Sequence, residues 1–372
     1  MKEYSVNIYI LQERTIPNHV RAFDMLCRAR GLEPRYHQFA MARPVLATLV
    51  KRDFRRLRIE VERLLAMLSL LPRLIFGPRA LIVLGIAPFD FRITFLVPFL
   101  LRHSVYLHNS WPSWGPGEPV PKSWFLSISK SIWNSFVSKH IQGIFCVSEK
   151  TATSISAHFP SWPPCAVIGH TIDAAWFADQ ESSETKPWRR SVAYIGRLVA
   201  EKGIDELLAL ADALPDFQFH FFGNGPMEDA VRNSGLSNVI FHGYVEDSAT
   251  LIKRLQACDV VAQPSRHSGA WVEAFGLGVL ECMARGLIPV TTNSPGSLTV
   301  LGEELKFLTC PVADYQEHFL HIVKSLDDER CRTLRRRCTQ RATYFQPQAV
   351  SERWDVLLSD SDAWINSSML MK

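Results

Sequence analysis

Residues 265–286, SRHSGAWVEAFGLGVLECMARG, decide the fold of this chain. Two glutamates, Glu273 and Glu281, are separated there by the seven residues AFGLGVL, which are small or apolar. Residues 278–284 predict a buried helix that starts between Ala274 and Gly276. Glu273 then lies just before the helix, and Glu281 lies about two turns further along, at roughly 1.5 Å per residue. The free N–H groups and the dipole of such a helix start both favour an anion.

The two carboxylates of this stretch suggest a ligand. A carboxylate close to an apolar helix interior needs hydrogen-bond partners, and the hydroxyl groups of a ligand are suitable donors. Together with the helix start, the pattern indicates a site for a phosphorylated, hydroxyl-rich ligand. A core helix with one N-terminal carboxylate and one surface carboxylate is the alternative, and the stretch by itself does not separate the two.

The composition is that of an ordinary globular protein, and its charged residues are unevenly distributed along the chain. The chain has 372 residues, of which 47% are hydrophobic and 21% are charged, and this length is sufficient for two domains. The net charge is +4, but residues 1–80 hold 15 Lys and Arg against 7 Asp and Glu. A basic N-terminal region suggests an anionic partner, such as a membrane surface, a lipid-linked phosphate or a nucleic acid.

The eight cysteines show neither a C-x2-C pair nor histidines at metal-binding spacing. We therefore expect reduced, packed thiols of a cytoplasmic protein, with no disulfide framework and no metal site. The first residues, MKEYSVNIYILQER, do not follow the pattern of a signal peptide, and the longest apolar run, Ile93–Leu101, is too short to span a bilayer. The expectation is a soluble or peripheral protein, in the cytoplasm or at the inner face of the plasma membrane.

Short apolar runs alternate with helical stretches along the chain. This alternation predicts βαβ units and parallel sheets with right-handed crossovers, which is an α/β fold. Residues 174–189, AAWFADQESSETKPWR, are polar and contain proline, which is typical of a linker between two halves. The expected strands are Val6–Leu11, Ala80–Leu84, Val105–Leu107, Gly143–Ser148 and Ala166–Gly169 in the first half, and Ser191–Ile195, Phe217–Phe222, Val239–Phe241, Asp259–Gln263 and Ile288–Val290 in the second.

Residues 45–71 predict a basic amphipathic helix. Apolar residues follow helical spacing from Leu46 to Leu68, and five Lys and Arg between Lys51 and Arg58 occupy the other faces. Such a helix is compatible with an anionic membrane surface. A core helix with a solvated outer face is the alternative.

His108 follows a predicted strand of the first half. Open α/β sheets bind ligands at the carboxyl ends of their strands, so His108 is a candidate site residue. A structural role at the end of a strand is the alternative. Residues 111–121 after it, rich in Pro, Gly and Trp, predict a loop.

Two glycine-bearing turns follow strands of the second half. Gly196-Arg197-x4-Lys202-Gly203 comes directly after an apolar strand, and two cations in that loop suit a diphosphate, Arg as a planar fork and Lys as a point charge. Two solvated loop cations are the alternative. After the next strand, the turn 223–226, Gly-Asn-Gly-Pro, lets backbone approach a ligand closely.

The combination of Gly-Arg-x4-Lys-Gly, Gly-x-Gly-Pro and Glu-x7-Glu resembles retaining glycosyltransferase family 4, the glycosyl transferases group 1. The resemblance is close over residues 191–350 and covers the first half only in its layout. It implies the GT-B fold, in which two Rossmann-like domains with parallel sheets face a central cleft and a C-terminal helix crosses back. The implied domains are an acceptor-binding domain at 1–173, a linker at 174–190, a nucleotide-sugar-binding domain at 191–350 and a tail helix at 351–372 that returns to the first domain.

The resemblance also implies a reaction. A hexose-type sugar is moved from a nucleotide-diphosphate sugar to an acceptor hydroxyl with retention of configuration, without a metal ion or cofactor, in the biosynthesis of an envelope polysaccharide or glycolipid. The expected partners are the donor, a glycan or lipid-linked acceptor and, through residues 45–71, a membrane surface, but no nucleic acid. In this reaction Arg197, Lys202 and the helix start would stabilise the diphosphate, Glu273 would hold the sugar, and Glu281 would hold the ribose. The implied catalytic residues are Glu273, Arg197, Lys202 and His108. The implied donor-binding residues are Glu281, Phe275, Gly276, Gly196, Gly223, Gly225 and Val245.

The chain departs from the family pattern at three places. The loop Gln12–His19 lacks the paired glycines of many members, and this supports the alternative of a catalytically weak or inactive nucleotide-sugar-binding partner subunit. His170 and Thr171 replace an Asn-Gly pair at the entry to the linker. Residues 266–272 lengthen the approach to Glu273, either as a reshaped sugar pocket or as a longer turn. A dehydrogenase is not supported, because no Gly-x-Gly-x2-Gly follows a first strand in either half.

Overall fold

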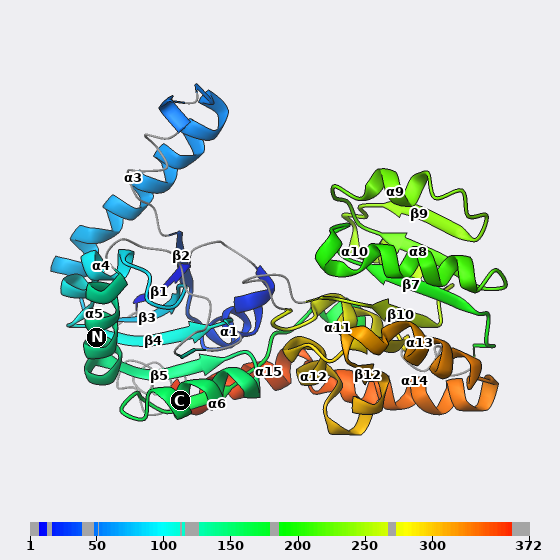
Figure 1. Cartoon of the computed structure of the whole chain (residues 1–372). Coiled ribbons are helices and arrows are strands. Elements are labelled where there is room, and N and C mark those ends of the chain that lie inside the picture. The colour runs from blue at the N-terminus through cyan, green and yellow to red at the C-terminus, as the bar shows by residue number, and fades with distance from the viewer. Residues whose placement is uncertain are drawn as a thin grey trace. The chain divides into compact units, whose positions relative to one another are not determined.

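The protein forms two compact units, each built on a parallel sheet (Figure 1). The computed structural model describes residues 7–12, 17–38, 48–50, 52–111, 114–115, 126–178, 186–266 and 273–358. Unit 1 comprises residues up to Ile168 together with those from Val350 onward, and unit 2 comprises Gly169–Ala349.

Unit 1 contains a parallel sheet of six strands in the order β2-β1-β3-β4-β5-β6. The central strands are buried on both faces, as expected for apolar parallel strands covered by helices. The strands are β1 Asn7–Gln12, β2 Pro34–Gln38, β3 Ala80–Gly85, β4 Ser104–Asn109, β5 Ile141–Cys146 and β6 Cys165–Val167, and the helices are α1 Pro17–Ala29, α3 Phe54–Phe76, α4 Arg92–Leu100, α5 Leu126–His140, α6 Glu149–His158 and α15 Pro347–Leu358.

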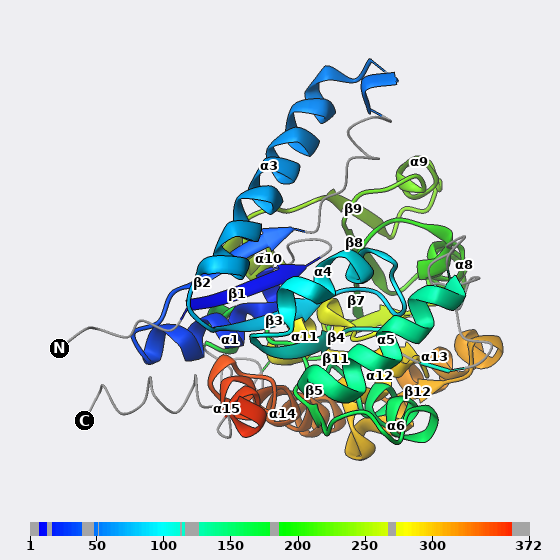
Figure 2. The ribbon, with the colours of Figure 1, turned by 90° about the vertical axis from the view of Figure 1, so that its left-hand side faces the viewer.

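Alternate residues of these strands enter two separate cores. Ile82 and Leu107 pack in one core with Leu70 of α3 and Trp133 of α5. The other core lies on the opposite face of the sheet, where α1 and α15 pack (Figure 2). Its main side chains are Phe23, Val83, Tyr106, Phe145 and Trp354.

Helix α15 therefore belongs to unit 1, although it follows unit 2 in the chain. Trp354 packs against Phe145 with ring centroids 4.3 Å apart. Arg30 forms a bidentate ion pair with Asp355, at 2.8 Å for each contact. Ser351 Oγ also donates a hydrogen bond to the Ala22 carbonyl at 2.8 Å. The expected return of a C-terminal helix is thus confirmed for α15, and residues 359–372 of the expected tail lie outside the described part.

Unit 2 contains a second parallel sheet, in the order β12-β11-β10-β7-β8-β9. The strand order runs outward in both directions from β7 and β10, so the topological switch point lies between these two strands. The strands are β7 Ser191–Ile195, β8 Gln218–Phe222, β9 Val239–Gly243, β10 Val260–Gln263, β11 Ile288–Thr292 and β12 Thr309–Cys310, and the α-helices are α8 Ile204–Ala213, α9 Glu228–Arg232, α10 Ser248–Leu255, α11 Leu277–Ala284, α12 Pro295–Leu301, α13 Tyr315–Lys324 and α14 Asp328–Thr343.

A buried ion pair joins the amino ends of the two strands beside the switch point. Asp259, just before β10, pairs with Arg335 of α14 at 2.5 Å, and both side chains are almost fully buried. The other Asp259 oxygen accepts hydrogen bonds from the backbone N–H groups of Arg189 and Ser191, before and at the start of β7. Burial raises the pKa of Asp259, and these donors oppose that shift. Removing either partner would leave a buried charge, so this contact fixes how the two strands start.

Several expectations about elements need correction. Strand β2 was not predicted from the sequence, because its residues PRYHQ are polar and half-exposed at a sheet edge. Helix α1 begins at Pro17, so the expected loop from Gln12 to His19 is shorter, and residues 13–16 lie outside the described part. Helix α11 begins at Leu277, slightly later than the expected start between Ala274 and Gly276, so Glu281 lies about one turn into the helix.

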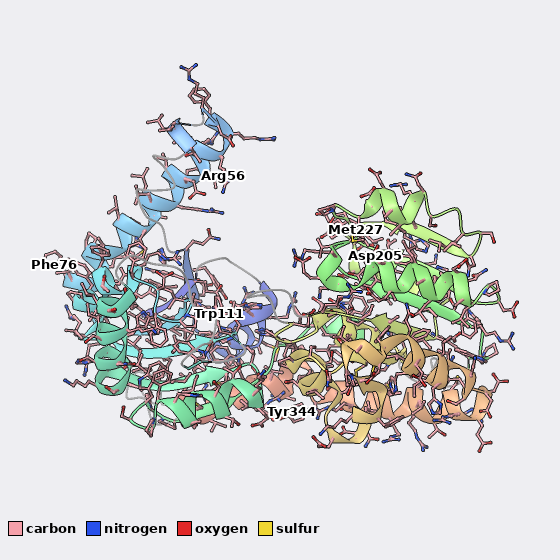
Figure 3. All side chains as sticks on the ribbon, viewed as in Figure 1. Arg56, Phe76, Trp111, Asp205, Met227 and Tyr344 are labelled. Carbon is pink, nitrogen blue, oxygen red and sulfur yellow. The ribbon has the colours of Figure 1, made fainter. Side chains whose placement is uncertain are left out.

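The basic helix expected at 45–71 also begins later, at Phe54. Arg52 has a left-handed backbone, with φ of 54°. Asp53 then caps the helix, since its side chain accepts a hydrogen bond from the Arg56 N–H at 3.1 Å. Many side chains of α3 stand free of the rest of unit 1 (Figure 3). No helix of the described residues has the length and the apolar composition needed to cross a bilayer.

Trp354→Ala should destabilise unit 1, because it removes the largest side chain that α15 places in the core. A truncation of this kind in a packed core costs about 3–5 kcal/mol. The free energy of unfolding can be measured by urea denaturation followed by far-ultraviolet circular dichroism. Val356→Ala is the matched control, since Val356 lies on the same helix and is 63% exposed. Equal stability of the two variants would contradict a core role for α15.

Candidate functional site

The candidate residues of unit 2 lie at the carboxyl ends of its strands. The loop after β7 carries Arg197 and Lys202, and the segment between β10 and α11 carries Glu273. Since β7 and β10 are neighbours in the sheet, these loops meet at the switch point. This is where open parallel sheets bind their ligands.

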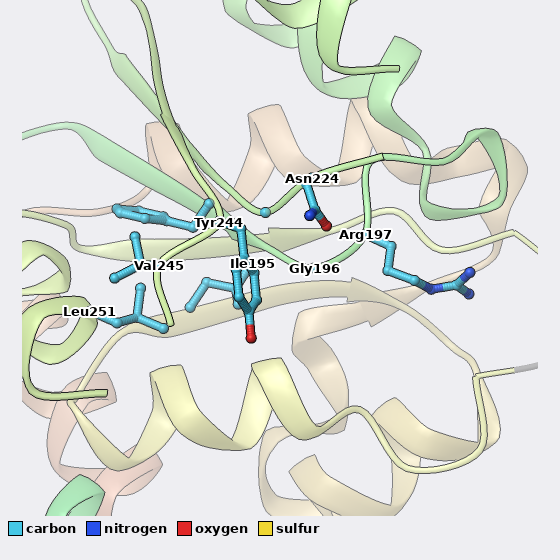
Figure 4. A pocket seen from close by; sticks show the side chains of 9 residues that line it. Ile195, Gly196, Arg197, Asn224, Tyr244, Val245 and Leu251 are labelled. Atoms are coloured by element: carbon cyan, nitrogen blue, oxygen red, sulfur yellow. The ribbon is translucent and has the colours of Figure 1, made fainter. Parts of the chain in front are cut away.

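A cavity of about 220 Å³ opens at the ends of β7, β8 and β9 (Figure 4). Ile195 and Phe222 form part of its wall where β7 and β8 end. Tyr244 and Val245 follow β9, and the side chain of Tyr244 is 67% exposed. The remaining lining residues are Gly196, Arg197, Gly223, Asn224 and Leu251.

Backbone approaches backbone closely between the two glycine turns. Gly223 has φ of 143°, and a Cβ there would collide with the Gly196 carbonyl oxygen. In the same way, a Cβ on Gly225 would collide with the carbonyl oxygen of Leu198. Leu198 N–H donates to the Asn224 carbonyl at 2.8 Å, which ties the two loops together. The glycines thus allow the loops to pack against each other and to form one edge of the cavity.

Arg197 is an available cation. Its side chain is exposed, and among the described residues it forms no ion pair or hydrogen bond. In Figure 4 it extends from the cavity wall away from Tyr244 and Val245. Its backbone is held, because the Tyr194 hydroxyl donates to the Arg197 carbonyl at 2.6 Å. Burial raises the pKa of Tyr194, and the nearby charge of Glu273 raises it further.

Lys202 and Glu273 form an ion pair across the switch point. They are 71 positions apart in the chain, and their side chains are only 12% and 16% exposed. Lys202 ends a 3₁₀ turn at Ala200–Lys202, and Glu273 lies four residues before α11. An anion that enters this site therefore meets a lysine already paired with a carboxylate.

The segment after Glu273 leads into the start of α11. Gly276 caps the helix with a left-handed φ of 68°, and Phe275 is buried against Phe345 and His170. Helix α12 supports this segment, since the Gly296 N–H donates to the Glu273 carbonyl at 2.9 Å. A Cβ on Gly296 would lie only 2.6 Å from the Phe275 nitrogen.

Gly296 was not identified from the sequence, although its surroundings carry a signal. Ser294, followed by a proline and a glycine, has the residue types of a capped helix start. The Ser294 hydroxyl does accept from the Ser297 N–H at 3.1 Å. The contact that makes Gly296 necessary lies with residues about 20 positions earlier in the chain, and local residue types do not predict it.

Glu281 lies one turn into α11 on the face that meets β7. Gly278, three positions earlier on the same face, packs on Ile195, since a Cβ there would lie 3.2 Å from the Ile195 carbonyl oxygen. Burial raises the pKa of Glu281 to about 7. No donor among the described residues hydrogen-bonds its carboxylate. This carboxylate can therefore accept hydrogen bonds from a ligand.

His108 lies near the carboxyl end of β4 in unit 1. It is 3% exposed, and its ring stacks on Trp354 with centroids 5.4 Å apart. The ring of His19 lies 6.0 Å away. Burial, followed by the proximity of His19, lowers the pKa of His108 to about 3. His108 is therefore neutral at physiological pH, and its catalytic role stays a prediction.

The departures from the family pattern are only partly described. Thr171 Oγ1 donates to the Phe345 carbonyl at 2.7 Å, and the ring of His170 lies 4.9 Å from that of Phe275, so both replacements pack inside unit 2. Residues 267–272 lie outside the described part, and Arg266 pairs with Glu206. Residues 186–188 of the expected linker are part of unit 2, where the Trp188 N–H donates to Asp328 at 2.7 Å.

Comparison with known proteins identifies the family of unit 2. Residues 177–344 match the family described as glycosyl transferases group 1. A GDP-mannose-dependent monoacylated alpha-(1-6)-phosphatidylinositol monomannoside mannosyltransferase of Corynebacterium glutamicum is 27% identical over 168 residues, or 40% of this chain and 44% of that protein. A GDP-mannose-dependent alpha-(1-6)-phosphatidylinositol dimannoside mannosyltransferase of Mycobacterium tuberculosis is 30% identical over 171 residues, or 44% of this chain and 42% of that protein. The match thus spans less than half the length of these relatives.

Solved structures extend the similarity in fold to nearly the whole chain. Sucrose-phosphate synthase from Thermosynechococcus elongatus has a TM-score of 0.67 at 16% identity, covering 95% of this chain and 98% of its own. Anabaena Alr3699/HepE in complex with UDP has a TM-score of 0.64 at 14% identity, covering 95% of this chain and 100% of its own. The comparisons give no support to a non-catalytic partner subunit.

Gly223→Ala should destabilise unit 2 because the new methyl group meets backbone that cannot rotate away. Gly235→Ala is the matched control: Gly235 also has a positive φ, 75°, but no atom lies within 4 Å of a Cβ built there. Strain of the backbone alone costs about 1–3 kcal/mol at either position. We expect a larger loss for Gly223→Ala, measured by urea denaturation. Equal losses would contradict the close loop contact.

Glu281→Gln should stabilise the protein at about pH 8 and have little effect at about pH 5. The folded-state pKa of about 7 exceeds the ordinary value of 4.5, so ionisation opposes folding as the pH rises between these values. Glutamine cannot ionise and avoids that cost. The thermal midpoint measures the effect at both pH values. Glu246→Gln, on an exposed glutamate, should show no such difference, and a pH-independent effect of Glu281→Gln would refute the burial argument.

These findings agree on one assignment. The glycine turns after β7 and β8, the ion pair of Lys202 with Glu273 and the largely buried Glu281 all lie within the matched residues 177–344. The two parallel six-stranded sheets have the architecture of the GT-B fold. Residues 177–344 of this chain match the glycosyl transferases group 1 family, and the chain has the GT-B fold.

Proposed function

We propose that this protein transfers a hexose-type sugar from a nucleotide-diphosphate sugar to an acceptor hydroxyl, with retention of anomeric configuration and without a metal ion. The observation that carries the proposal is the convergence of Arg197, Lys202 and Glu273 at the switch point of unit 2. Two cations, a carboxylate and a helix start within one pair of neighbouring loops suit a substrate that carries both phosphate and hydroxyl groups.

Departure of the nucleotide diphosphate builds negative charge on its oxygens. Arg197, which is exposed and without a partner among the described residues, would bind these oxygens as a planar fork. The Lys202 ammonium has three donors, so it can bind phosphate while it still contacts Glu273. The free N–H groups at the start of α11 add partial positive charge. These fixed groups would stabilise the leaving diphosphate and supply the role that a metal ion has in other transferases.

Glu273 is the carboxylate that would face the sugar. The ion pair with Lys202 and the Gly296 N–H bond to its carbonyl hold it at the switch point. From there it would accept a hydrogen bond from a sugar hydroxyl and stabilise positive charge that develops at the anomeric carbon. The diphosphate oxygen would accept the proton of the acceptor hydroxyl on the same face of the sugar.

The nucleoside would occupy the region of the cavity. Val245 would contact the base through its backbone, in the wall that follows β9. Glu281 would accept hydrogen bonds from the ribose hydroxyls, which are donors of the kind its carboxylate lacks among the described residues. Such donors stabilise the ionised form, so ligand binding should lower the pKa of Glu281 from its raised value.

The acceptor would belong to a glycolipid or an envelope polysaccharide. The two mannosyltransferases compared above carry phosphatidylinositol mannosides in their names, which supports a lipid-linked acceptor. Unit 1 would bind it, and His108 would be the catalytic residue that this unit contributes. A lipid-linked acceptor places the reaction at the inner face of the plasma membrane, with the protein held there peripherally through residues 45–71.

Donor binding tests the proposal directly. The protein should be stabilised against heat by one member of a panel of UDP-, GDP- and ADP-sugars in the presence of EDTA, and should hydrolyse it slowly. A ligand at 100 times its Kd stabilises by about 2.7 kcal/mol, which is a readable shift. No shift with any nucleotide sugar would overturn the proposal.

Arg197→Ala should weaken donor binding by about tenfold to a hundredfold, since a hydrogen bond to a charged group contributes about 1.5–3 kcal/mol. Isothermal titration calorimetry with the stabilising donor measures the change. Lys253→Ala is the matched control, because it removes an exposed cation of α10 in the same unit. An equal effect of the two substitutions would show that Arg197 acts only through general charge.

A further inference from the structure

Helix α3 leaves more large apolar side chains exposed to solvent than it buries in the core of unit 1. It has 23 residues, of which only Met67, Leu70 and Leu74 are buried. These three lie in its C-terminal half and pack in a core of unit 1. The N-terminal half extends beyond the sheet of unit 1 (Figure 1), as the view turned by 90° also shows (Figure 2).

Five of the six exposed large apolar side chains of α3 share one face. Phe54, Leu65, Leu68, Ile75 and Phe76 are exposed at 70%, 60%, 49%, 39% and 84%. At 3.6 residues per turn they fall within a stripe about 100° wide. The buried Met67, Leu70 and Leu74 lie on a different side, so α3 is apolar on two faces, one for the core of unit 1 and one open to solvent. The stripe runs the full length of the helix, about 34 Å.

The remaining surface of the outer half is basic. Arg58 pairs with Glu62 at 2.9 Å, and Arg63 pairs with Glu60 at 3.2 Å. Arg55 and Arg56 have no ion pair among the described residues, and Figure 3 shows Arg56 at the outer end of α3. The outer half of α3 therefore has two arginines without an ion pair among the described residues. Both acidic residues of the helix, Glu60 and Glu62, are already paired, so the helix has a net positive charge.

Charge decides between the two occupants that could cover such a stripe. A second copy of the chain paired in parallel would bring two sets of unpaired arginines together, which costs free energy. An anionic lipid surface would instead neutralise them while the apolar side chains enter the boundary between headgroups and acyl chains.

We infer that α3 is a membrane-docking helix that lies in the plane of an anionic bilayer surface, with its stripe inserted and its arginines among the headgroups. This deepens the proposed function, on whose lipid-linked acceptor it rests. Docking would hold unit 1 at the surface where that acceptor lies. Its test measures vesicle binding without sugar transfer, so the two proposals can fail separately.

Co-sedimentation with vesicles tests the docking helix on the full chain. The protein should bind vesicles of phosphatidylglycerol and phosphatidylcholine in equal parts, and bind phosphatidylcholine alone much more weakly. Leu65→Gln with Leu68→Gln should lower the affinity at least about tenfold, because each leucine loses apolar burial. Ile59→Gln is the matched control: Ile59 is 45% exposed on α3 but lies outside the stripe.

A charge variant separates the contribution of the anionic headgroups to vesicle binding from the contribution of the apolar stripe. Arg55→Glu with Arg56→Glu should remove the preference for phosphatidylglycerol, and raising the salt concentration should weaken binding of the unaltered chain. All substituted residues are exposed, so circular dichroism should show unchanged folding. Equal vesicle binding by Leu65→Gln/Leu68→Gln and Ile59→Gln would overturn the inference. A second result would also overturn the inference: the unaltered chain does not bind vesicles but forms a dimer, and Leu65→Gln with Leu68→Gln dissociates that dimer. The stripe would then pair with a second copy of the chain.

Discussion

The ion pair of Arg335 with Asp259 is the contact on which the candidate site depends most. It joins α14 to the start of β10, and the second carboxylate oxygen of Asp259 accepts hydrogen bonds from the backbone at the start of β7. Strands β7 and β10 are neighbours, and their carboxyl ends carry the loops of the site. A charged pair buried to this degree tolerates little displacement, because a separated partner would be left charged in an apolar interior. The amino ends of the two strands thus determine where their carboxyl ends place Lys202 and Glu273.

The charged residues of the candidate site differ in how far they are exposed to solvent, and their electrostatic roles differ accordingly. Arg197 is exposed and has no partner in the part of the chain that the structure describes, so it can meet an incoming anion without breaking a contact there. Lys202 and Glu273 are nearly buried and neutralise each other, which keeps a charged centre stable while no ligand is bound. Glu281 is largely buried and has no hydrogen-bond donor among the described residues, and burial raises its pKa. A ligand with phosphates and hydroxyls would satisfy all of these groups at once.

The two units use their apolar residues differently. In unit 1, two cores cover both faces of the sheet, and the last helix returns from the far end of the chain to complete one of them. Helix α3 contributes three residues to the other core and leaves a second apolar face in solvent. The pattern of apolar and polar residues predicts that a helix is amphipathic. It does not predict which of its apolar faces are buried against another part of the fold.

Much of the fold followed from the sequence alone. Alternation of apolar strands with helical stretches predicted the two parallel sheets, since buried parallel strands carry a local signal that needs no neighbour. The Glu-x7-Glu and Gly-Arg-x4-Lys-Gly stretches predicted a candidate site and a helix start close to the observed Leu277, because motif spacing is a property of the chain. Only the tertiary structure decided that Lys202 pairs with Glu273, that Gly223 serves a contact with Gly196, that His108 packs under Trp354 and that the polar segment Pro34–Gln38 adds a strand. These contacts join residues distant in the chain, and they depend on strand order and register, which no local pattern specifies.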